Sequence, residues 1–313
     1  MPRSFRSTSG RRDRAAPTSA DTPMLILEQN VIFGLLVGGL YGLAAMGLAL
    51  VFGVLKMLNV AHGELIMLGG YVGFWLFTLW KIDPFASLIT SALALFLTGI
   101  LLYRVLFSRL IYFPEEAKLK NSILIGFGLA LVIQTLAILA WKADERAVTT
   151  PYAGAILPVA GVVVPLARLG ALGVAFLALG GLHLFLHRTL PGKAIRATAE
   201  DVEAASLAGI SVPTVFLTSF GLGSALAGIA GTLVSMTDAI SPAIGLNWTL
   251  KALIVVVLSG LGNIFGTFVA GLLLGVAESL SGFLLGNAYR EVMGLVVFLL
   301  VLSLRPQGLF TRG

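Results

Sequence analysis

Long runs of apolar residues, separated by short polar segments, constrain this chain more than any other feature of its sequence. Several runs extend over 18 or more residues with almost no charge. A helix needs about 20 consecutive apolar residues to cross the hydrocarbon core of a bilayer. Charged residues make up only 12% of the chain, about half of their share in a soluble domain. The sequence therefore predicts an all-α polytopic integral membrane protein.

The apolar runs divide residues 24–313 into about 8–9 transmembrane or re-entrant helices that form one domain. The ten-residue alternating segments typical of a transmembrane β-barrel are absent. Glycines break one long apolar region near residue 263, and the sequence leaves open whether 249–262 spans or re-enters. The predicted spans are 31–52, 64–80, 85–103, 122–141, 169–186, 214–236, 249–262, 264–285 and 290–304.

Residues 1–23 differ from the rest of the chain. They contain five Arg and many Ser and Thr, with no apolar periodicity, so we expect them to be disordered. The basic stretch is not followed at once by a short apolar core and a cleavage site, as a signal peptide would be. Met24 is an alternative start, in which case residues 1–23 would be the product of a mis-called start codon.

Lys and Arg in the short loops predict the orientation, because cytoplasmic loops carry an excess of these residues. Ten lie on one side: Lys56, Arg104, Arg109, Lys118, Lys120, Arg188, Lys193, Arg196, Arg305 and Arg312. Six lie on the other: Lys81, Lys142, Arg146, Arg168, Lys251 and Arg290. The first side, with the C-terminus, is expected to be cytoplasmic and Met24 external. The five Arg of the tail would remove this bias, which favours a start at Met24 or a mobile tail.

The most polar segment, residues 187–213, lies between two predicted spans. Pro191 and Gly192 mark its start, and Gly209 follows the last good helical residue, where a left-handed cap is easily adopted. The segment predicts a short amphipathic helix whose apolar stripe needs a partner, either the bilayer or a groove on another protein. The stripe consists of Ile195, Ala199, Val202, Ala205 and Leu207.

Polar residues accompany glycines at two breaks in the apolar pattern, one in each half of the chain. These are Asn-Val-Ala-His-Gly-Glu at 59–64 and Ser-Gly-Leu-Gly-Asn-Ile-Phe-Gly at 259–266. Broken helices in corresponding halves point to a transport path, because irregular backbone at membrane depth lies around a cavity or inside protein. We favour Asn59, Gly260, Gly262 and Asn263 as path residues.

Three further polar residues have ordinary interpretations beside functional ones. His62 fits a helix end or a packing position better than a ligand position. Glu64 falls in a first helical turn, where a carboxylate suits the helix dipole. Glu278 lies well inside a span, where an ionisable group is functional or bound to a partner.

The composition argues against several kinds of chemistry. There is no Cys, and His62, His183 and His187 lack metal-ligand spacing, so we expect no metal site and no cofactor. The chain has no Gly-x-x-x-x-Gly-Lys-[Ser/Thr] motif and cannot cradle ATP phosphates in that way. Segments 142–168 and 237–248 could face a periplasmic partner or serve as plain connectors, and three prolines prevent a continuous helix in the first.

Motifs spread over residues 31–310 resemble one family of ABC importer permeases, the high-affinity branched-chain amino acid permeases. The Asn-Val-Ala-His-Gly-Glu stretch resembles a signature of that family, and Glu203-Ala-Ala-x-x-x-Gly209 resembles the loop that seats in an ATPase subunit. Further similarity lies in Ala-Glu-Asp at 199–201, Ser-Leu-Ala-Gly-Ile at 206–210, Gly-Val-Ala-Glu-Ser-Leu at 275–280 and Arg-Pro-Gln-Gly-Leu-Phe at 305–310. Ser259 and Asn263 depart from the family's Gly-Gly-x-Gly-Ser-x-x-Gly. The closer likeness is to the first of two paired, non-identical permeases.

This resemblance implies an inner-membrane subunit that works with two cytoplasmic ATPases, a second permease and a periplasmic binding protein. The implied ATPase-coupling residues are Ile195, Glu200, Asp201, Glu203, Ala204, Ala205, Leu207 and Gly209. The candidate translocation residues are Asn59, His62, Glu64, Gly260, Gly262, Asn263 and Glu278. The substrate and the choice between homodimer and heterodimer stay open.

Two other transport functions remain possible at this stage. Some permeases of this family resemble urea or short-amide importers. A gradient-driven secondary transporter would need intramembrane carboxylates on paired broken helices, and Glu278 is one candidate. A membrane-embedded enzyme is disfavoured, because no carboxylate completes a His-Glu-x-x-His pattern around His183 and His187.

Overall fold

The computed structural model describes residues 21–159 and 162–310, with side chains described from Met24 onward except that of Val159. Residues 1–20, the greater part of the predicted tail, lie outside this range; residues 21–23 already belong to the first helix. Within the described residues, eight helices are long and apolar enough to cross a membrane, which confirms the polytopic prediction. They are α1 (Asp21–Leu55), α2 (His62–Trp80), α3 (Pro84–Leu102), α4 (Glu115–Trp141), α5 (Leu166–Arg188), α8 (Val212–Thr237), α10 (Ile264–Leu284) and α11 (Arg290–Leu304). By itself, helix α11 has 15 residues and reaches membrane length only together with the helical turn before it, as the 18-residue span Asn287–Leu304.

A ninth apolar helix, α9 (Ile244–Ser259), has only 16 residues. At 1.5 Å per residue it extends about 24 Å, less than the roughly 30 Å hydrocarbon core. It ends at the predicted glycine break. It begins inside segment 237–248, so the last five residues of this expected loop are helical. Short helical turns follow α3 and precede α11: a π-helix (Tyr103–Phe107) and the 3-10 helices Ser108–Tyr112 and Asn287–Tyr289.

Segment 142–168 contains no long helix before α5, as its prolines predicted, but it is not entirely irregular. Strands β1 (Ile156–Val159) and β2 (Val162–Pro165) form an antiparallel hairpin with Ile156 opposite Pro165. The run of three valines in β2 explains this, because β-branched side chains fit a pleated strand. In the part of the chain that the structure describes, the fold is thus mainly helical, with one small sheet.

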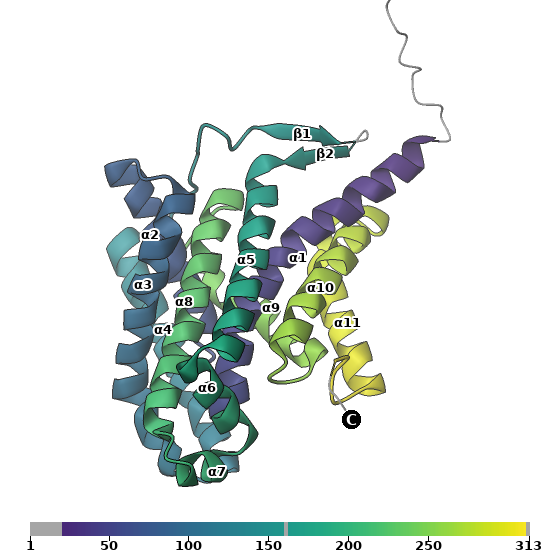
Figure 1. Ribbon diagram of the computed structural model, residues 1–313. Coiled ribbons are helices and arrows are strands. Elements are labelled where there is room, and N and C mark those ends of the chain that lie inside the picture. The colour runs from purple at the N-terminus through teal and green to yellow at the C-terminus, as the bar shows by residue number, and fades with distance from the viewer. Residues whose placement is uncertain (1–20, 160–161, 311–313) are drawn as a thin grey trace, which may run out of the picture.

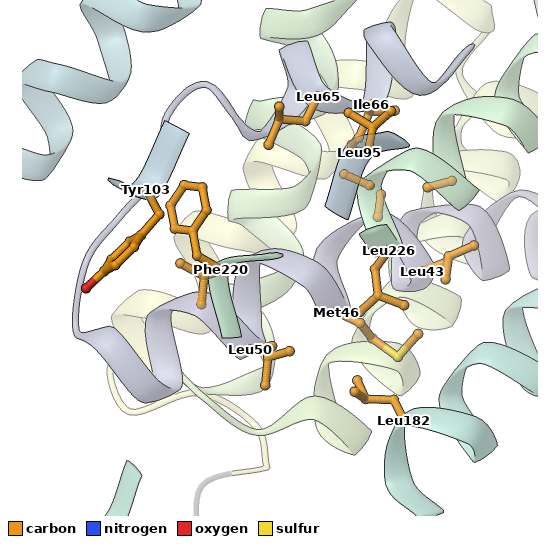
Figure 2. Close-up of a cluster of buried hydrophobic side chains, with 14 of the residues drawn as sticks. Leu43, Met46, Leu50, Leu65, Ile66, Leu95, Tyr103, Leu182, Phe220 and Leu226 are labelled. Atoms are coloured by element: carbon orange, nitrogen blue, oxygen red, sulfur yellow. The ribbon is translucent and has the colours of Figure 1, made fainter. Parts of the chain in front are cut away.

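Helix α1 lies at the centre of the bundle and contacts α5, α8, α9 and α10 (Figure 1). Its closest neighbour is α10, against which it packs through glycines on both helices. The small residues let the two backbones approach, as is common between helices in membranes. On the other side of α1, large side chains from α1, α2, α3, α5 and α8 fill a continuous core, part of which Figure 2 shows. Members of that core include Met46, Leu50, Leu65, Leu182, Phe220 and Leu226.

The two ends of the bundle differ. The β1–β2 hairpin lies at one end, here called the hairpin end (Figure 1). Two short helices, α6 (Leu190–Glu200) and α7 (Val202–Leu207), lie at the other, here called the α6 end. The C-terminal segment also lies toward the α6 end. Arg188, Lys193, Arg196 and Arg305 therefore lie toward one end, as the loop-charge pattern predicts.

Candidate functional site

The connection between α1 and α2 is irregular backbone buried inside the bundle. The Thr249 hydroxyl of α9 accepts a hydrogen bond from the Gly63 N–H at 2.9 Å and donates one to the Val60 carbonyl at 2.9 Å. The buried Asn59 side chain accepts a hydrogen bond from the Ala61 N–H at 3.1 Å. Backbone without helical hydrogen bonds is tolerated at membrane depth where protein groups satisfy it. Asn59 therefore has a structural partner at this turn.

His62 and Glu64 lie in the first turn of α2, as predicted, and both are buried. The His62 Nε2 lies 2.9 Å from the Ala44 carbonyl oxygen. A carbonyl oxygen only accepts, so Nε2 carries the proton and donates. The Glu64 carboxyl group packs against Gly245 at the start of α9. Together these contacts hold the start of α2 against α1 and α9.

The glycine break between α9 and α10 is a tight turn joined to the C-terminal segment. Gly260 and Gly262 both have φ of +93°, a backbone conformation that favours glycine. The Asn263 side chain caps α10 by accepting from the Gly266 N–H at 2.9 Å, and it donates to the Phe310 carbonyl at 2.8 Å. These contacts give Asn263 a role in holding the end of the chain.

Glu278 has two partners inside the bundle. Its carboxylate forms an ion pair of 2.9 Å with Lys251 and accepts a hydrogen bond of 2.8 Å from the Tyr41 hydroxyl. The structure thus supports the expectation that this group is bound to a partner. Lys251 belongs to α9 and not to a loop, so counting it among the loop cations was wrong; its neighbouring carboxylate explains a cation at that depth.

Segment 187–213 forms two helices, so the prediction of one amphipathic helix was wrong. Thr189 caps α6 by accepting from the Gly192 N–H at 3.1 Å. Asp201 then interrupts the helix with an extended backbone, and its side chain accepts from the N–H groups of Glu203 and Ala204 at 2.9 and 3.0 Å. A free carboxylate so placed is a strong N-cap, and it starts α7 in a new direction.

The end of α7 follows the prediction. Gly209 has φ of +84°, and the Ile210 N–H donates to the Ala205 carbonyl at 3.0 Å. This combination is the usual glycine-containing end of a helix. The turn redirects the chain into α8.

The candidate coupling residues divide into a buried and an exposed set. Ile195 and Ala205 are buried, because α6 packs against α1, α5 and α8 and α7 packs against α8. Leu207, in contrast, is 91% exposed. The exposed set is Glu200, Asp201, Glu203, Ala204, Leu207 and Gly209. Part of the apolar stripe is therefore covered by this chain's own helices.

Two cavities lie at opposite ends of α1. The α6-end cavity, about 620 Å³, is lined by Gly53, Lys193, Arg196 and Gly262 among others. The hairpin-end cavity, about 540 Å³, is lined by residues of α1, α5, α9, α10 and α11 and of the segments preceding α9 and α11. Sequence reasoning found only Glu278 in the second cavity. The residues it missed there include Tyr41, Arg168, Asp238, Trp248, Arg290 and Glu291, which share no local motif.

No group of three or more His, Asp or Glu side chains within the described ranges could hold a metal ion. His183 and His187 stack on each other at 4.0 Å between ring centroids, near the end of α5.

Comparison with known proteins decides the family. Residues 30–302 match the family described as "Branched-chain amino acid transport system / permease component". The chain belongs to this family. It is 34% identical over 293 residues to the Pseudomonas aeruginosa high-affinity branched-chain amino acid transport system permease protein BraD, covering 91% of this chain and 95% of that one.

Other members of the permease family are similar over nearly their whole length. The permease protein LivH of Escherichia coli K12 is 30% identical, with 92% of this chain and 96% of LivH covered. A probable LivH of Methanocaldococcus jannaschii is 28% identical, with 91% of each chain covered. No solved structure matches the chain. The chain is thus a multi-pass permease component, in agreement with the eight membrane-length helices found among its described residues.

Proposed function

We propose that this chain is the inner-membrane permease subunit of an ATP-driven importer and forms a translocation path for branched-chain amino acids. Membership of the permease family and the printed names of BraD and LivH support this substrate class. The sequence has no phosphate-binding loop of the Gly-x-x-x-x-Gly-Lys-[Ser/Thr] type. ATP therefore binds to separate subunits, two of which dock on the α6 end of the assembled importer.

The observation that carries this proposal is the exposed helix pair α6–α7 between two membrane-length helices. Leu207 exposes an apolar side chain on α7, the same short helix that carries the exposed Glu203 and is capped by the exposed Asp201. A short helix that presents an apolar residue with charged neighbours fits a groove on a partner protein. We assign Glu200, Asp201, Glu203, Ala204, Leu207 and Gly209 to the ATPase-docking surface. Ile195 and Ala205 support that surface from beneath.

Loop charges support an orientation in which the α6 end and the C-terminus are cytoplasmic. Met24 and the hairpin end then face the periplasm, where a substrate-binding protein delivers the amino acid. The α6-end cavity opens toward the ATPases and is lined by Gly53 and Gly262. Gly260 belongs to the same turn between α9 and α10 as Gly262. Asn59, His62, Glu64 and Asn263 act on the path indirectly, by holding the helices that border it. A second permease subunit completes the path.

Co-purification with ATPase subunits tests the docking surface. The chain is expressed with its ATPases, its companion permease and its binding protein, and the complex is isolated in mild detergent. Glu203→Lys and Leu207→Asp should each remove the ATPases while leaving the amount of inserted permease unchanged. Glu116→Lys is the matched control. Glu116 is an exposed carboxylate of α4, and its ion-pair partner Lys120 is exposed as well.

Uptake into proteoliposomes tests the function itself. The wild-type complex should import L-leucine only with ATP, and isoleucine and valine should compete while urea does not. Uptake that persists without ATP and follows an ion gradient would contradict the importer and favour a secondary transporter. Retention of the ATPases by both α7 variants would contradict the docking assignment alone.

A further inference from the structure

The hairpin-end cavity is lined by charges of both signs in equal number. Three cations and three carboxylates contribute to its wall: Arg168, Lys251 and Arg290, and Asp238, Glu278 and Glu291. Arg168 pairs with Asp238 at 3.3 Å, and Lys251 pairs with Glu278 at 2.9 Å. The cavity as a whole is therefore neutral but strongly polar.

One cation and one carboxylate of this set have no ion-pair partner among the described residues. Arg290 and Glu291 form no ion pair within the described residues. They are neighbours at the start of α11, and both border the cavity. A guanidinium binds a carboxylate through two parallel hydrogen bonds, and a carboxylate binds an ammonium group. The two free groups complement a small molecule with one charge of each sign.

The rest of the wall is aromatic and aliphatic. The centre of the Phe33 ring lies 4.5 Å from the Arg168 guanidinium and 5.8 Å from that of Arg290, so it orients both cations. Tyr41 and Trp248 meet edge to face at 5.7 Å between ring centroids. Val37, Leu40 and Ile244 complete the apolar part of the lining. Such a surface suits an apolar side chain next to the charged groups.

The Lys251–Glu278 pair forms part of the cavity wall, together with Tyr41. Glu278 is 4% exposed and Tyr41 donates to it at 2.8 Å. Below them, α1, α9 and α10 are packed through buried small and aliphatic residues that include Ala45, Leu48 and Val255. Tyr41 belongs to this packed cluster and thus joins it to the wall of the cavity.

We propose that the hairpin-end cavity binds one zwitterionic amino acid with an apolar side chain before it is translocated. Its carboxylate binds Arg290, its ammonium group binds Glu291, and its side chain packs against Phe33 and Trp248. A volume of about 540 Å³ lies within the usual range for small-molecule sites. This inference rests on the proposed function, because the direction of entry follows from the import of amino acids.

Photo-crosslinking with L-photo-leucine, a diazirine analogue of leucine, tests the site directly. The full chain is held in lipid nanodiscs without binding protein and without ATP, illuminated, and digested for mass spectrometry. Labels should fall on residues 33–41, 244–251 and 287–291, and an excess of L-leucine should remove them. Labelling elsewhere, labelling that leucine does not displace, or no labelling of these segments overturns the proposal.

Charge variants and competitors test how the ligand is held. Arg290→Gln and Glu291→Gln should each weaken saturable labelling by about tenfold or more, since each removes a charge-assisted hydrogen bond. Arg290→Lys should recover part of the affinity, and Glu145→Gln, an exposed carboxylate beside Arg146 in the connector before β1, should leave labelling unchanged. Isocaproate, which lacks the ammonium group, and isoamylamine, which lacks the carboxylate, should compete far less well than leucine. Equal competition by either compound overturns the zwitterion assignment.

Different results would contradict the importer function and the amino-acid site in the hairpin-end cavity. Wild-type proteoliposomes without ATP-dependent leucine uptake would contradict the importer. Normal ATP-dependent uptake, together with wild-type KM for loaded binding protein and wild-type labelling in Arg290→Gln, would contradict only the site.

Discussion

The hydroxyl group of Thr249 lies between two backbone groups of the α1–α2 connection, accepting from the Gly63 N–H and donating to the Val60 carbonyl, each at 2.9 Å. These residues are almost 190 positions apart in the sequence. One side chain of α9 thus satisfies two backbone groups of this irregular connection inside the bundle. The contact explains how the chain can break its helix at this depth.

Thr249→Val should destabilise the protein by about 2 kcal/mol or more, because it leaves two buried backbone groups without partners. Valine has the shape of threonine, so packing is preserved. Thr249→Ser keeps the hydroxyl group and should be much closer to wild type. Thermal unfolding in detergent, followed by size-exclusion chromatography, measures the difference. Equal midpoints for the two variants would show that the hydroxyl is unimportant.

The ion pair between Lys251 and Glu278 should show the behaviour of a buried pair. Lys251→Met leaves a carboxylate that is 4% exposed with only the Tyr41 hydroxyl as a partner, a change that typically costs about 3–5 kcal/mol. The double variant Lys251→Met/Glu278→Leu removes both charges and should recover most of that stability.

The pair Lys120–Glu116 is the control for this cycle. It is as short, at 2.7 Å, but its side chains are 72% and 82% exposed. Lys120→Met should change the unfolding midpoint little, since exposed pairs contribute little. A double variant of the buried pair that is as unstable as the single variant would contradict the argument.

Close packing of α1 on α10 should make Gly38 intolerant of a side chain. A Cβ atom at Gly38 would lie 2.7 Å from the Gly271 carbonyl oxygen, so the two backbones would have to separate. Overpacking of this kind costs about 1–3 kcal/mol. Gly180→Ala in α5 meets no atom within 4 Å and should be neutral or slightly stabilising. Thermal unfolding of the two alanine variants tests this difference.

The left-handed backbone conformation at Gly209 should tolerate asparagine better than valine. A side chain there meets nothing within 4 Å, so only the φ of +84° opposes substitution. Asparagine adopts this conformation readily, whereas valine does so at a cost of about 1–2 kcal/mol. Gly209→Val should reduce ATPase co-purification by displacing α7, and Gly209→Asn should preserve it. Similar recovery of ATPase by both variants would argue against a role for this turn.

The hydrogen bond between Tyr152 and Asp83 predicts that the protein loses stability at alkaline pH. The Tyr152 hydroxyl donates to the Asp83 carboxylate at 2.7 Å. Burial first, and then the Asp83 carboxylate, raise the pKa of the phenol above its usual value. The hydrogen bond requires the protonated phenol, so its contribution is complete below the unfolded-state pKa of about 10. It is lost as the pH rises through the higher pKa of the folded state.

The variant Tyr152→Phe isolates this effect. Its unfolding midpoint should fall below that of wild type by a constant amount from neutral pH to about pH 10. Above that range the difference should shrink. A difference that grows with pH would show that the sign is wrong.

The sequence by itself determined the features that depend on local pattern. Apolar runs predicted the membrane helices, because crossing a bilayer requires a minimum length of apolar residues regardless of what surrounds them. The cap at Gly209 and the break at Gly260 were also predictable, since a positive φ is a property of the residue and its neighbours. Short motifs were enough to indicate the permease family, which the matched residues 30–302 show.

Only the tertiary structure decided which polar residues have partners and which are free. Asn263 meets Phe310, Thr249 meets Gly63, and Glu278 meets Lys251 and Tyr41. The same holds for Ile195 and Ala205, whose burial depends on neighbouring helices. These contacts join residues that are distant in sequence, so they follow from how the helices pack and leave no periodic signal. The unpaired Arg290 and Glu291 are recognisable only in the folded chain, where the other four charges that line the hairpin-end cavity form two ion pairs.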